Sequence, residues 1–317
     1  MIPYIDFHCD TLMRAWELGA SSVNVLPEAM VDTERLEKGG CLAQFFAVFM
    51  MPQPKKPDSD DDAYIDALLR IFHASQQGEL AFAGNLQDYR RNRETGKISG
   101  FLTLEDGRAV NGSMERLERF YKMGIRLITL TWNYVNCFGS PNSSDPAVMA
   151  QGLTPFGKDG VRRMQELGML VDVSHLSDGG FWDVAELCRE PFVASHSNCR
   201  ALNPHPRSMT DDMIRTLADR GGVMGVNFCP NFLRKNLREN TSRVEDLVRH
   251  LRHMVNIGGL GCAAIGSDLD GIDGNLEIGS ADQMPLLFQT MERAGFHESE
   301  IEQIAWKNAE QVLETLR

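Results

Sequence analysis

The sequence predicts an α/β protein with a single domain, a (β/α)8 barrel (TIM barrel) that spans residues 1–317. Short runs of β-branched and aromatic residues recur eight times along the chain, and stretches with helical periodicity separate them. This alternation is typical of βα units around one parallel sheet. The length of 317 residues also suits a barrel of this type, which needs about 250 residues. No linker divides the chain.

The predicted strands are short and apolar, and they end in polar residues. They are Tyr4–Asp10, Cys41–Met50, Ser99–Glu105, Arg126–Trp132, Leu170–His175, Phe192–Ser197, Gly222–Phe228 and Ala263–Asp268. The hydrophobic pattern predicts helices between them, including Asp61–Ser75, Ser113–Met123, Asp159–Leu167, Asp211–Arg220, Val244–Ile257 and Asp282–Ala294. A last helix, Glu298–Leu316, would complete the outer ring. Residues 51–62 combine prolines with an acidic run, which predicts an extended surface loop.

The composition argues against a nucleic-acid partner and a membrane segment. The formal net charge is −12, and no Lys/Arg-rich stretch offsets it. The first residues lack the basic and apolar regions of a signal peptide, and no run reaches the roughly 20 apolar residues of a membrane span. We therefore expect a soluble, cytoplasmic protein. The seven scattered cysteines form no CxxC pair, which indicates buried thiols in a reducing compartment.

Ionisable side chains gather at the C-terminal ends of five predicted strands, where barrel enzymes build their sites. They are His8, Asp10, Glu105, His175, His196 and Asp268. Strand alternation directs His8 and Asp10 to one face and Cys9 to the other. A single histidine at a strand end is more often structural than a ligand, but the joint occurrence predicts one shared concave site. Surface positions are predicted for the histidines in helical or loop stretches, His73, His250, His253 and His297.

The charges of this group indicate two metal ions. Three carboxylates in a partly desolvated cleft repel one another, and three histidines cannot neutralise them without raising the carboxylate pKa values. Two divalent ions carry four positive charges, which three carboxylates and a bridging hydroxide balance. Nitrogen and oxygen ligands without thiolate suit Zn²⁺, Mn²⁺, Fe²⁺ or Co²⁺, and they argue against copper electron transfer and iron–sulfur chemistry.

Eight segments in order along the chain resemble the membrane-dipeptidase (renal-dipeptidase) family of metallopeptidases, which have an amidohydrolase-like barrel. The segments are Asp6-Phe-His-Cys-Asp-Thr, Leu104-Glu-Asp-Gly, Leu127-Ile-Thr-Leu-Thr-Trp-Asn, Gly152-Leu-Thr-Pro-Phe-Gly, Val171-Asp-Val-Ser-His-Leu-Ser-Asp, Ala194-Ser-His-Ser, Val226-Asn-Phe and Gly266-Ser-Asp-Leu-Asp-Gly. Each motif is modest alone, whereas the ordered set covers nearly the whole chain. The resemblance implies hydrolysis of the amide bond of dipeptides by a metal-bridging hydroxide, with tolerance of L-Xaa-D-Xaa substrates.

The resemblance also implies a role for each residue of the group. His8, Asp10 and Asp268 would bind one ion and His175 and His196 the other, with Glu105 bridging both. Zinc is the expected metal, with manganese, iron and cobalt as alternatives. Asp268 would accept the proton of the nucleophilic water and donate it to the departing amine. Arg207, in Asn203-Pro-His-Pro-Arg-Ser, matches the arginine that holds the substrate's terminal carboxylate.

One departure from the family pattern concerns the histidine that stabilises the oxyanion, the negative charge that develops on the carbonyl oxygen during hydrolysis. Mammalian members have a histidine after Leu-Thr-Leu-Thr, whereas this chain has Trp132 and then Asn133. The metals can polarise the carbonyl themselves, and Asn133 or His205 could assist, with Trp132 as a pocket wall. Asp270 is an alternative to Asp268 for proton transfer, although its Asp-Gly setting also suits a turn.

Two other functions remain open from the sequence. A related amidohydrolase acting on N-acyl amino acids or lactones would use the same metals with a different pocket. A catalytically silent metal-binding protein is the second alternative. The sequence does not fix the oligomeric state, and a homodimer is one of the possibilities.

Overall fold

The computed structural model describes residues 1–50, 61–234 and 240–317. Most of the predicted loop at residues 51–62 lies outside these ranges, and its last two residues begin helix α3. Within the described ranges, no helix has both the length and the apolar character needed to cross a membrane.

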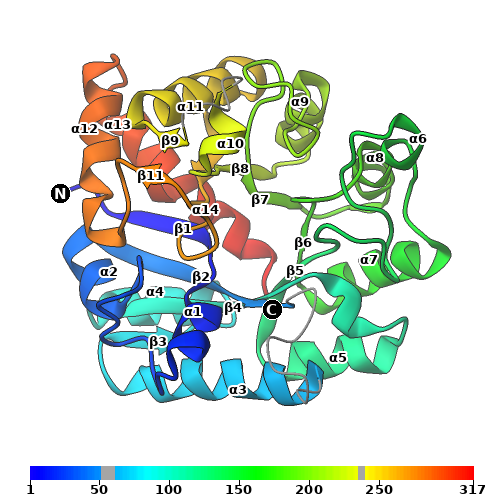
Figure 1. The fold of residues 1–317 in the computed structure, drawn as a ribbon, viewed down its shortest axis with the longest axis horizontal. Helices are drawn as coiled ribbons and strands as arrows, with labels where there is room; N and C mark the ends of the chain where they lie inside the picture. Colours follow the sequence, from blue (N-terminus) through cyan, green and yellow to red (C-terminus); the bar gives the residue numbers. More distant parts are fainter. Residues whose placement is uncertain (51–60, 235–239) are drawn as a thin grey trace.

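A closed parallel barrel of eight strands forms the centre of the fold (Figure 1). The strands follow the order β2, β1, β10, β8, β7, β6, β5 and β4, and pairing of β2 with β4 closes the barrel. Their bounds are β1 (Tyr4–Cys9), β2 (Cys41–Phe49), β4 (Ile98–Glu105), β5 (Ile125–Thr129), β6 (Leu170–Asp172), β7 (Val193–Ser197), β8 (Val223–Val226) and β10 (Ala263–Ile265). Each overlaps a predicted strand, although several end up to three residues earlier than predicted, and the predicted barrel is confirmed.

Three further strands are very short, and only β3 joins the sheet of the barrel. Strand β3 (Leu80–Phe82) pairs in parallel with the first three residues of β4, and β9 (Thr241–Ser242) pairs with β11 (Asn275–Leu276) in a separate ribbon. The sequence analysis missed all three because two or three residues are too few to show a period of two.

Helices surround the barrel and cover its outer face (Figure 1). They are α1 (Thr11–Leu18), α2 (Thr33–Gly39), α3 (Asp61–Ala74), α4 (Leu86–Glu94), α5 (Met114–Lys122), α6 (Pro146–Met149), α7 (Pro155–Leu167), α8 (Asp178–Leu187), α9 (Asp211–Asp219), α10 (Pro230–Leu233), α11 (Val244–Gly258), α12 (Pro285–Arg293), α13 (Glu298–Glu302) and α14 (Asn308–Val312). Helix α7 begins four residues before the predicted Asp159, because the Thr154 side chain caps it and Pro155 occupies its first turn.

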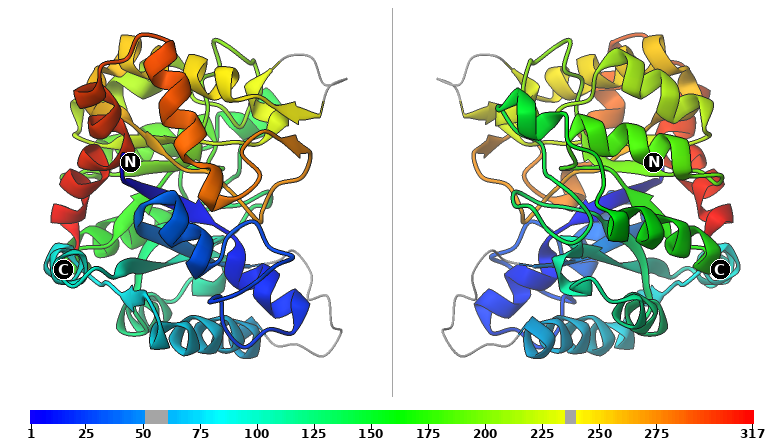
Figure 2. Two further views of the ribbon diagram at one scale, coloured as in Figure 1. Left: turned by 90° about the vertical axis from the view of Figure 1, so that its left-hand side faces the viewer. Right: turned by 90° about the vertical axis from the view of Figure 1, so that its right-hand side faces the viewer.

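The predicted C-terminal helix is interrupted. A π-helical turn (Gln303–Lys307) separates α13 from α14, and a 3₁₀ turn (Leu313–Thr315) follows. The buried Asn308 explains the altered register, because its amide donates to the carbonyls of Leu260 and Ala263 beside β10. This segment (red) lies on the side of the molecule opposite the β9–β11 ribbon (yellow and orange) in Figure 2.

The barrel interior is filled by one apolar cluster that draws residues from all eight strands. It contains Ile5, Phe7, Ala43, Phe45, Phe101, Leu127, Leu170, Val193, Val223 and Ala264, together with Ala309, Val312 and Leu313 of the C-terminal segment. The C-terminal segment therefore closes one end of the barrel. The polar strand ends lie at the other end, which leaves that mouth free for a site.

One prediction about the histidines is wrong. His250 is buried, whereas His73 and His297 are exposed and His253 is half-buried. The ring of His250 accepts a hydrogen bond from the backbone N–H of Cys199 and pairs with the carbonyl of Leu233 through Nε2. Helix α11 buries its apolar face, and these two partners replace the hydrogen bonds that the ring would form with water.

Candidate active site and metal centre

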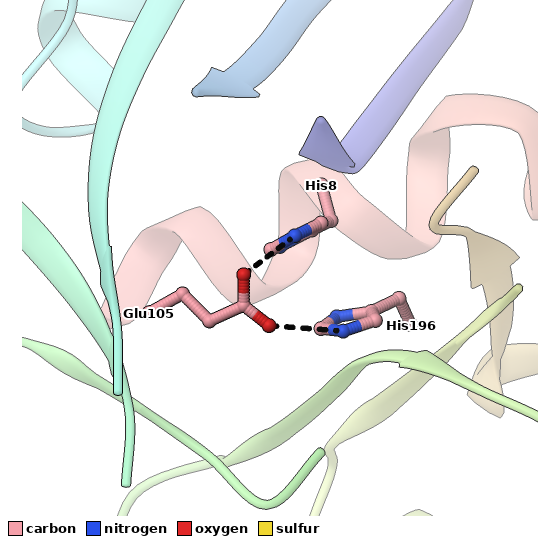
Figure 3. A group of neighbouring side chains, drawn as sticks. All are labelled: His8, Glu105 and His196. Carbon is pink, nitrogen blue, oxygen red and sulfur yellow. Dashed lines mark ion pairs between the residues drawn. The ribbon is translucent and has the colours of Figure 1, made fainter. Parts of the chain in front are cut away.

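The six ionisable residues predicted from the strand ends come together at the barrel mouth. His8 lies at the end of β1, Asp10 directly precedes α1, and Glu105 ends β4. His175 and Asp268 follow β6 and β10, and His196 lies in β7. Figure 3 shows the carboxylate of Glu105 between the rings of His8 and His196.

His8 is the centre of a first group of oxygens. Its Nε2 atom lies 3.3 Å from Glu105 Oε2, 3.5 Å from Asp10 Oδ2 and 3.7 Å from Asp268 Oδ1. The ligand atoms of His8, Asp10 and Asp268 all lie within 4.8 Å of one another. An ion between them would therefore meet one nitrogen and carboxylate oxygens.

His175 and His196 form a second group on the other oxygen of Glu105. Glu105 Oε1 lies 3.3 Å from His175 Nε2 and 3.6 Å from His196 Nε2, and the two nitrogens are 3.1 Å apart. The two carboxylate oxygens of Glu105 thus face different histidines. The rings of His8 and His196 stack with centroids 3.9 Å apart, so the two groups are adjacent.

Backbone irregularities aim several of these side chains into the mouth. The pairing of β1 with β2 shifts register between Asp6 and Cys9, and β7 shifts against β8 between Ala194 and Ser197. Phe7 packs in the interior cluster, and the next residue, His8, also points into the barrel mouth. Strict alternation would put these two neighbours on opposite faces of the strand. His175 and Asp268 have φ values of 67° and 65°, a conformation that residues other than glycine adopt at a cost and that gathers at functional sites.

The site is buried, and burial shifts the pKa values of its ionisable groups. Removal from water raises the pKa of Glu105 to about 7 and that of Asp268 to about 6. Burial lowers the pKa of His175 and that of His196 well below the ordinary value, and nearby positive charges add to the effect. Burial also opposes the charged form of His8, but Glu105 and Asp10 outweigh it and raise its pKa.

The donor set fits divalent metal ions. His8 Nε2 and Asp10 Oδ1 are buried and have no hydrogen-bond partner in the described part of the chain. Buried polar atoms are normally paired, and these two lie where three carboxylates and three histidines converge. Imidazole nitrogens and carboxylate oxygens are ligands that zinc and its first-row neighbours accept.

Gly271 is needed for the close approach of two of the carboxylates. A Cβ atom at this position would lie 2.0 Å from Asp10 Oδ2 and 2.8 Å from Asp268 Oδ1. Any side chain would therefore displace Asp10 or Asp268. The sequence analysis did not single out Gly271, because its only signal is the Asp270-Gly271 pair, which is also typical of turns.

Asn227, directly after β8, was also missed. Its amide donates to Asp268 Oδ2 at 2.8 Å and leaves Oδ1 of that carboxylate on the side of His8. A polar residue at the C-terminal end of a sixth strand was the available signal. Asp270 faces elsewhere, since it accepts hydrogen bonds from Thr11 Oγ1, Met30 N and Val31 N.

A cavity of about 400 Å³ opens onto the ionisable group. Arg207, Trp132 and Asn133, predicted to contact substrate, all line it, and so do His205, Asn142 and Phe232. Trp132 is half-buried and packs edge-on against Phe49 with centroids 5.1 Å apart, which makes this side of the cavity an apolar wall. Asn133 is exposed at the rim.

Arg207 is fixed on one side and open on the other. Its Nη1 donates to Ser197 Oγ and its Nη2 to the carbonyl of His196, each at 2.8 Å. Its Nε atom is buried without a hydrogen-bond partner among the described residues. A guanidinium has five N–H donors, so donors remain for a carboxylate in the cavity.

Comparisons with known proteins give one consistent result. A family model described as membrane dipeptidase (peptidase family M19) matches residues 1–317. An uncharacterized protein in the pqqA 5′ region of Klebsiella pneumoniae is 35% identical over 257 residues, which are 79% of this chain and 94% of that protein. An uncharacterized dipeptidase of Schizosaccharomyces pombe is 32% identical over 303 residues, which are 89% of this chain and 72% of that protein.

Solved structures give the same result. A metallo peptidase from Rhodobacter sphaeroides, liganded with a phosphinate mimic of the dipeptide L-Ala-D-Ala, superposes with a TM-score of 0.90. The sequences are 26% identical, and the match covers 100% of this chain and 99% of that one.

Proposed function

Because the chain belongs to the membrane dipeptidase family, peptidase family M19, and is a metal-dependent dipeptidase, we propose that it works with two divalent metal ions held by the six residues at the barrel mouth. His8, Asp10 and Asp268 would hold one ion, and His175 and His196 the other. Glu105 would bridge both. The ligand types favour zinc, with manganese, iron and cobalt as alternatives.

The binuclear proposal rests on the two oxygens of the Glu105 carboxylate, which face different histidines. Oε2 faces His8 at 3.3 Å, and Oε1 faces His175 at the same distance. A single ion would need only one of these oxygens and would leave the other group of ligands unused. When bound, two ions that share a carboxylate polarise a scissile carbonyl and lower the pKa of a shared water towards neutrality.

The residues of the chain would handle the proton and the substrate. Asp268 lies beside the centre with Oδ2 held by Asn227, so Oδ1 would accept the proton of the attacking water and return it to the departing amine. Asn133 and His205 both line the cavity and carry donors for the carbonyl oxygen. Trp132 would pack against a substrate side chain.

The open donors of Arg207 would select the substrate class. A fixed guanidinium near the metal centre fits the free carboxylate of a dipeptide, since planar donors bind carboxylates through two parallel hydrogen bonds. Such an anchor limits cleavage to very short peptides. The relative from Rhodobacter sphaeroides holds a mimic of L-Ala-D-Ala, which supports tolerance of a D-residue at the C-terminal position.

A dipeptide library assayed on protein reconstituted separately with Zn²⁺ and Mn²⁺ tests this function. The library should contain L-L and L-D dipeptides with matched N-acetyl amino acids, and a chelated sample serves as control. We expect turnover of free dipeptides, including L-D dipeptides, that disappears on chelation. Faster turnover of the N-acetyl amino acids would replace this proposal with a broader amidohydrolase activity.

A further inference from the structure

His196 differs from the other two histidines of the site in how its second ring nitrogen is held. Its Nδ1 atom lies 2.7 Å from Ser195 Oγ. The Nδ1 atoms of His8 and His175 are buried and find no hydrogen-bond partner in the parts of the chain that the structure describes. Only His196, of the three, is therefore tied to a defined partner away from the proposed metal ions.

The partner of His196 is itself held by a buried carboxylate. Ser195 Oγ donates to Asp172 Oδ2 at 2.6 Å, and the backbone N–H of Ser195 donates to Oδ1 at 2.8 Å. Asp172 also accepts hydrogen bonds from Thr129 Oγ1 at 2.6 Å and Ser174 N at 2.9 Å. Four donors thus converge on one fully buried carboxylate, which acts only as an acceptor.

These hydrogen bonds fix the direction of the contact with His196. A serine hydroxyl has one proton, and a charge-assisted bond to a carboxylate is about twice as strong as a neutral one. The Ser195 proton therefore stays on the side of Asp172, so Ser195 Oγ accepts from His196. Nδ1 then carries the ring proton, and Nε2 keeps a lone pair towards Glu105 and His175.

We propose that Asp172 and Ser195 are a positioning pair that holds the His196 proton on Nδ1 and thereby presents Nε2 to a metal ion. The proposal rests on the proposed role of His196 as a metal ligand. Partners of this kind orient the ligand ring, and losing them typically weakens metal binding about 10–100-fold. Asp172 and Ser195 are not among the residues that line the cavity, and neither is a proposed ligand, so their effect on the metal would be indirect.

A second aspartate–serine pair, Asp6 and Ser267, is a matched control for Asp172 and Ser195. Asp6 holds Ser267 in the same way, with Ser267 N at 2.8 Å from Oδ1 and Ser267 Oγ at 2.6 Å from Oδ2. Both serines are buried, and each directly precedes a proposed ligand, Asp268 or His196. Ser267 Oγ, however, contacts the carbonyl of His8 rather than an imidazole nitrogen. Ser267→Ala therefore removes the same kind of bond without freeing a ring.

The experiment compares zinc affinity and thermal unfolding for wild type, Ser195→Ala, Ser267→Ala and His196→Ala. Zinc is titrated in competition with a chromophoric chelator. We expect Ser195→Ala to bind one of two zinc ions about 10–100-fold more weakly, and Ser267→Ala to stay within about threefold of wild type. If both serine variants unfold at similarly lowered temperatures, a difference in stability does not account for the difference in their zinc affinities.

Three results would overturn the proposal. Equal zinc affinity in Ser195→Ala and wild type, with weaker binding in His196→Ala, would contradict the role of the positioning pair but not the proposed metal site. Equal losses of zinc affinity in the two serine variants would mean that the effect comes from a general disturbance of the structure and not from the ring of His196. Unchanged zinc binding in His196→Ala would contradict the proposal that His196 is a metal ligand, and with it the role of the positioning pair.

A measurement on the wild-type zinc enzyme needs no stable variant of Ser195. Histidine ¹⁵N spectra, assigned by the signal missing from His196→Ala, locate the ring proton of His196. We expect it on Nδ1 and in slower exchange with water than that of His175. A proton on Nε2, or exchange as fast as that of His175, contradicts the proposal.

Discussion

His175 and His196 approach each other through their Nε2 atoms at 3.1 Å, and both nitrogens face Oε1 of Glu105. The two residues come from neighbouring strand ends, and His175 reaches its position through a left-handed backbone conformation. Two imidazole nitrogens at this distance are stable together when one carries a proton or when both bind a cation. We propose that this pair supplies the two histidine ligands of one of the two metal ions.

The variant Asp268→Asn tests proton transfer. The amide cannot accept the proton of water, so kcat should fall by a factor on the order of 10² or more, with a smaller change in KM. Steady-state kinetics on a dipeptide gives both constants. Metal content must be measured on the same sample, because Asp268 is also a proposed ligand. An unchanged kcat in the fully metallated variant would transfer the role to another residue.

The variant Gly271→Ala tests the crowding of the carboxylates. The added Cβ would lie 2.0 Å from Asp10 Oδ2, so the carboxylate must move, and metal binding should weaken about 10–100-fold, as for other supporting groups. Gly261→Ala is the control, since a Cβ there meets nothing within 4 Å. Competitive metal titration measures both. If the two variants bind metal equally well, the carboxylates do not need the space at Gly271.

The variant Arg207→Met tests the substrate anchor. Loss of a bidentate, charge-assisted contact should cost about 2–4 kcal/mol in kcat/KM for free dipeptides. C-terminal amides of the same dipeptides lack the matching charge and should lose little. The comparison of acid and amide separates the anchor from general damage. Equal losses for the two substrates, or wild-type turnover of amides as fast as acids, contradict the role.

The sequence predicted the barrel and the convergence of six ionisable residues at its mouth, because both depend on local patterns. Each barrel strand is a separate apolar run, and Glu105 or His196 at a strand end is visible without the fold. Asp172 and Ser195 were not predicted, because their contact depends on how β6 and β7 lie beside each other. The burial of His250 was missed for the same reason, since its partners Cys199 and Leu233 come from other parts of the chain.

His250 predicts a loss of stability in acid. Burial lowers its pKa from the ordinary 6.5 to about 4, so the unfolded chain takes up a proton that the folded protein excludes. The free energy of unfolding should therefore fall as pH drops from 6.5 to 4, by at most about 3 kcal/mol from this group. His250→Gln keeps a donor and an acceptor but does not titrate.

Urea unfolding of wild type and His250→Gln between pH 7.5 and 4 measures this contribution as a difference. The stability of the variant should depend less steeply on pH below 6.5, whatever its stability at neutral pH. Parallel curves across the whole range would mean that His250 titrates normally in the folded protein.

Metal analysis of Glu105→Gln beside wild type is the most direct test of a centre with two ions bridged by one carboxylate. Both proteins are loaded with zinc, dialysed, and measured for zinc per chain together with dipeptide hydrolysis. Wild type should retain close to two ions per chain. Glu105→Gln should lose zinc from both positions and lose activity, because the amide cannot supply a negative oxygen to each ion. Full zinc and full activity in Glu105→Gln would contradict the bridged centre.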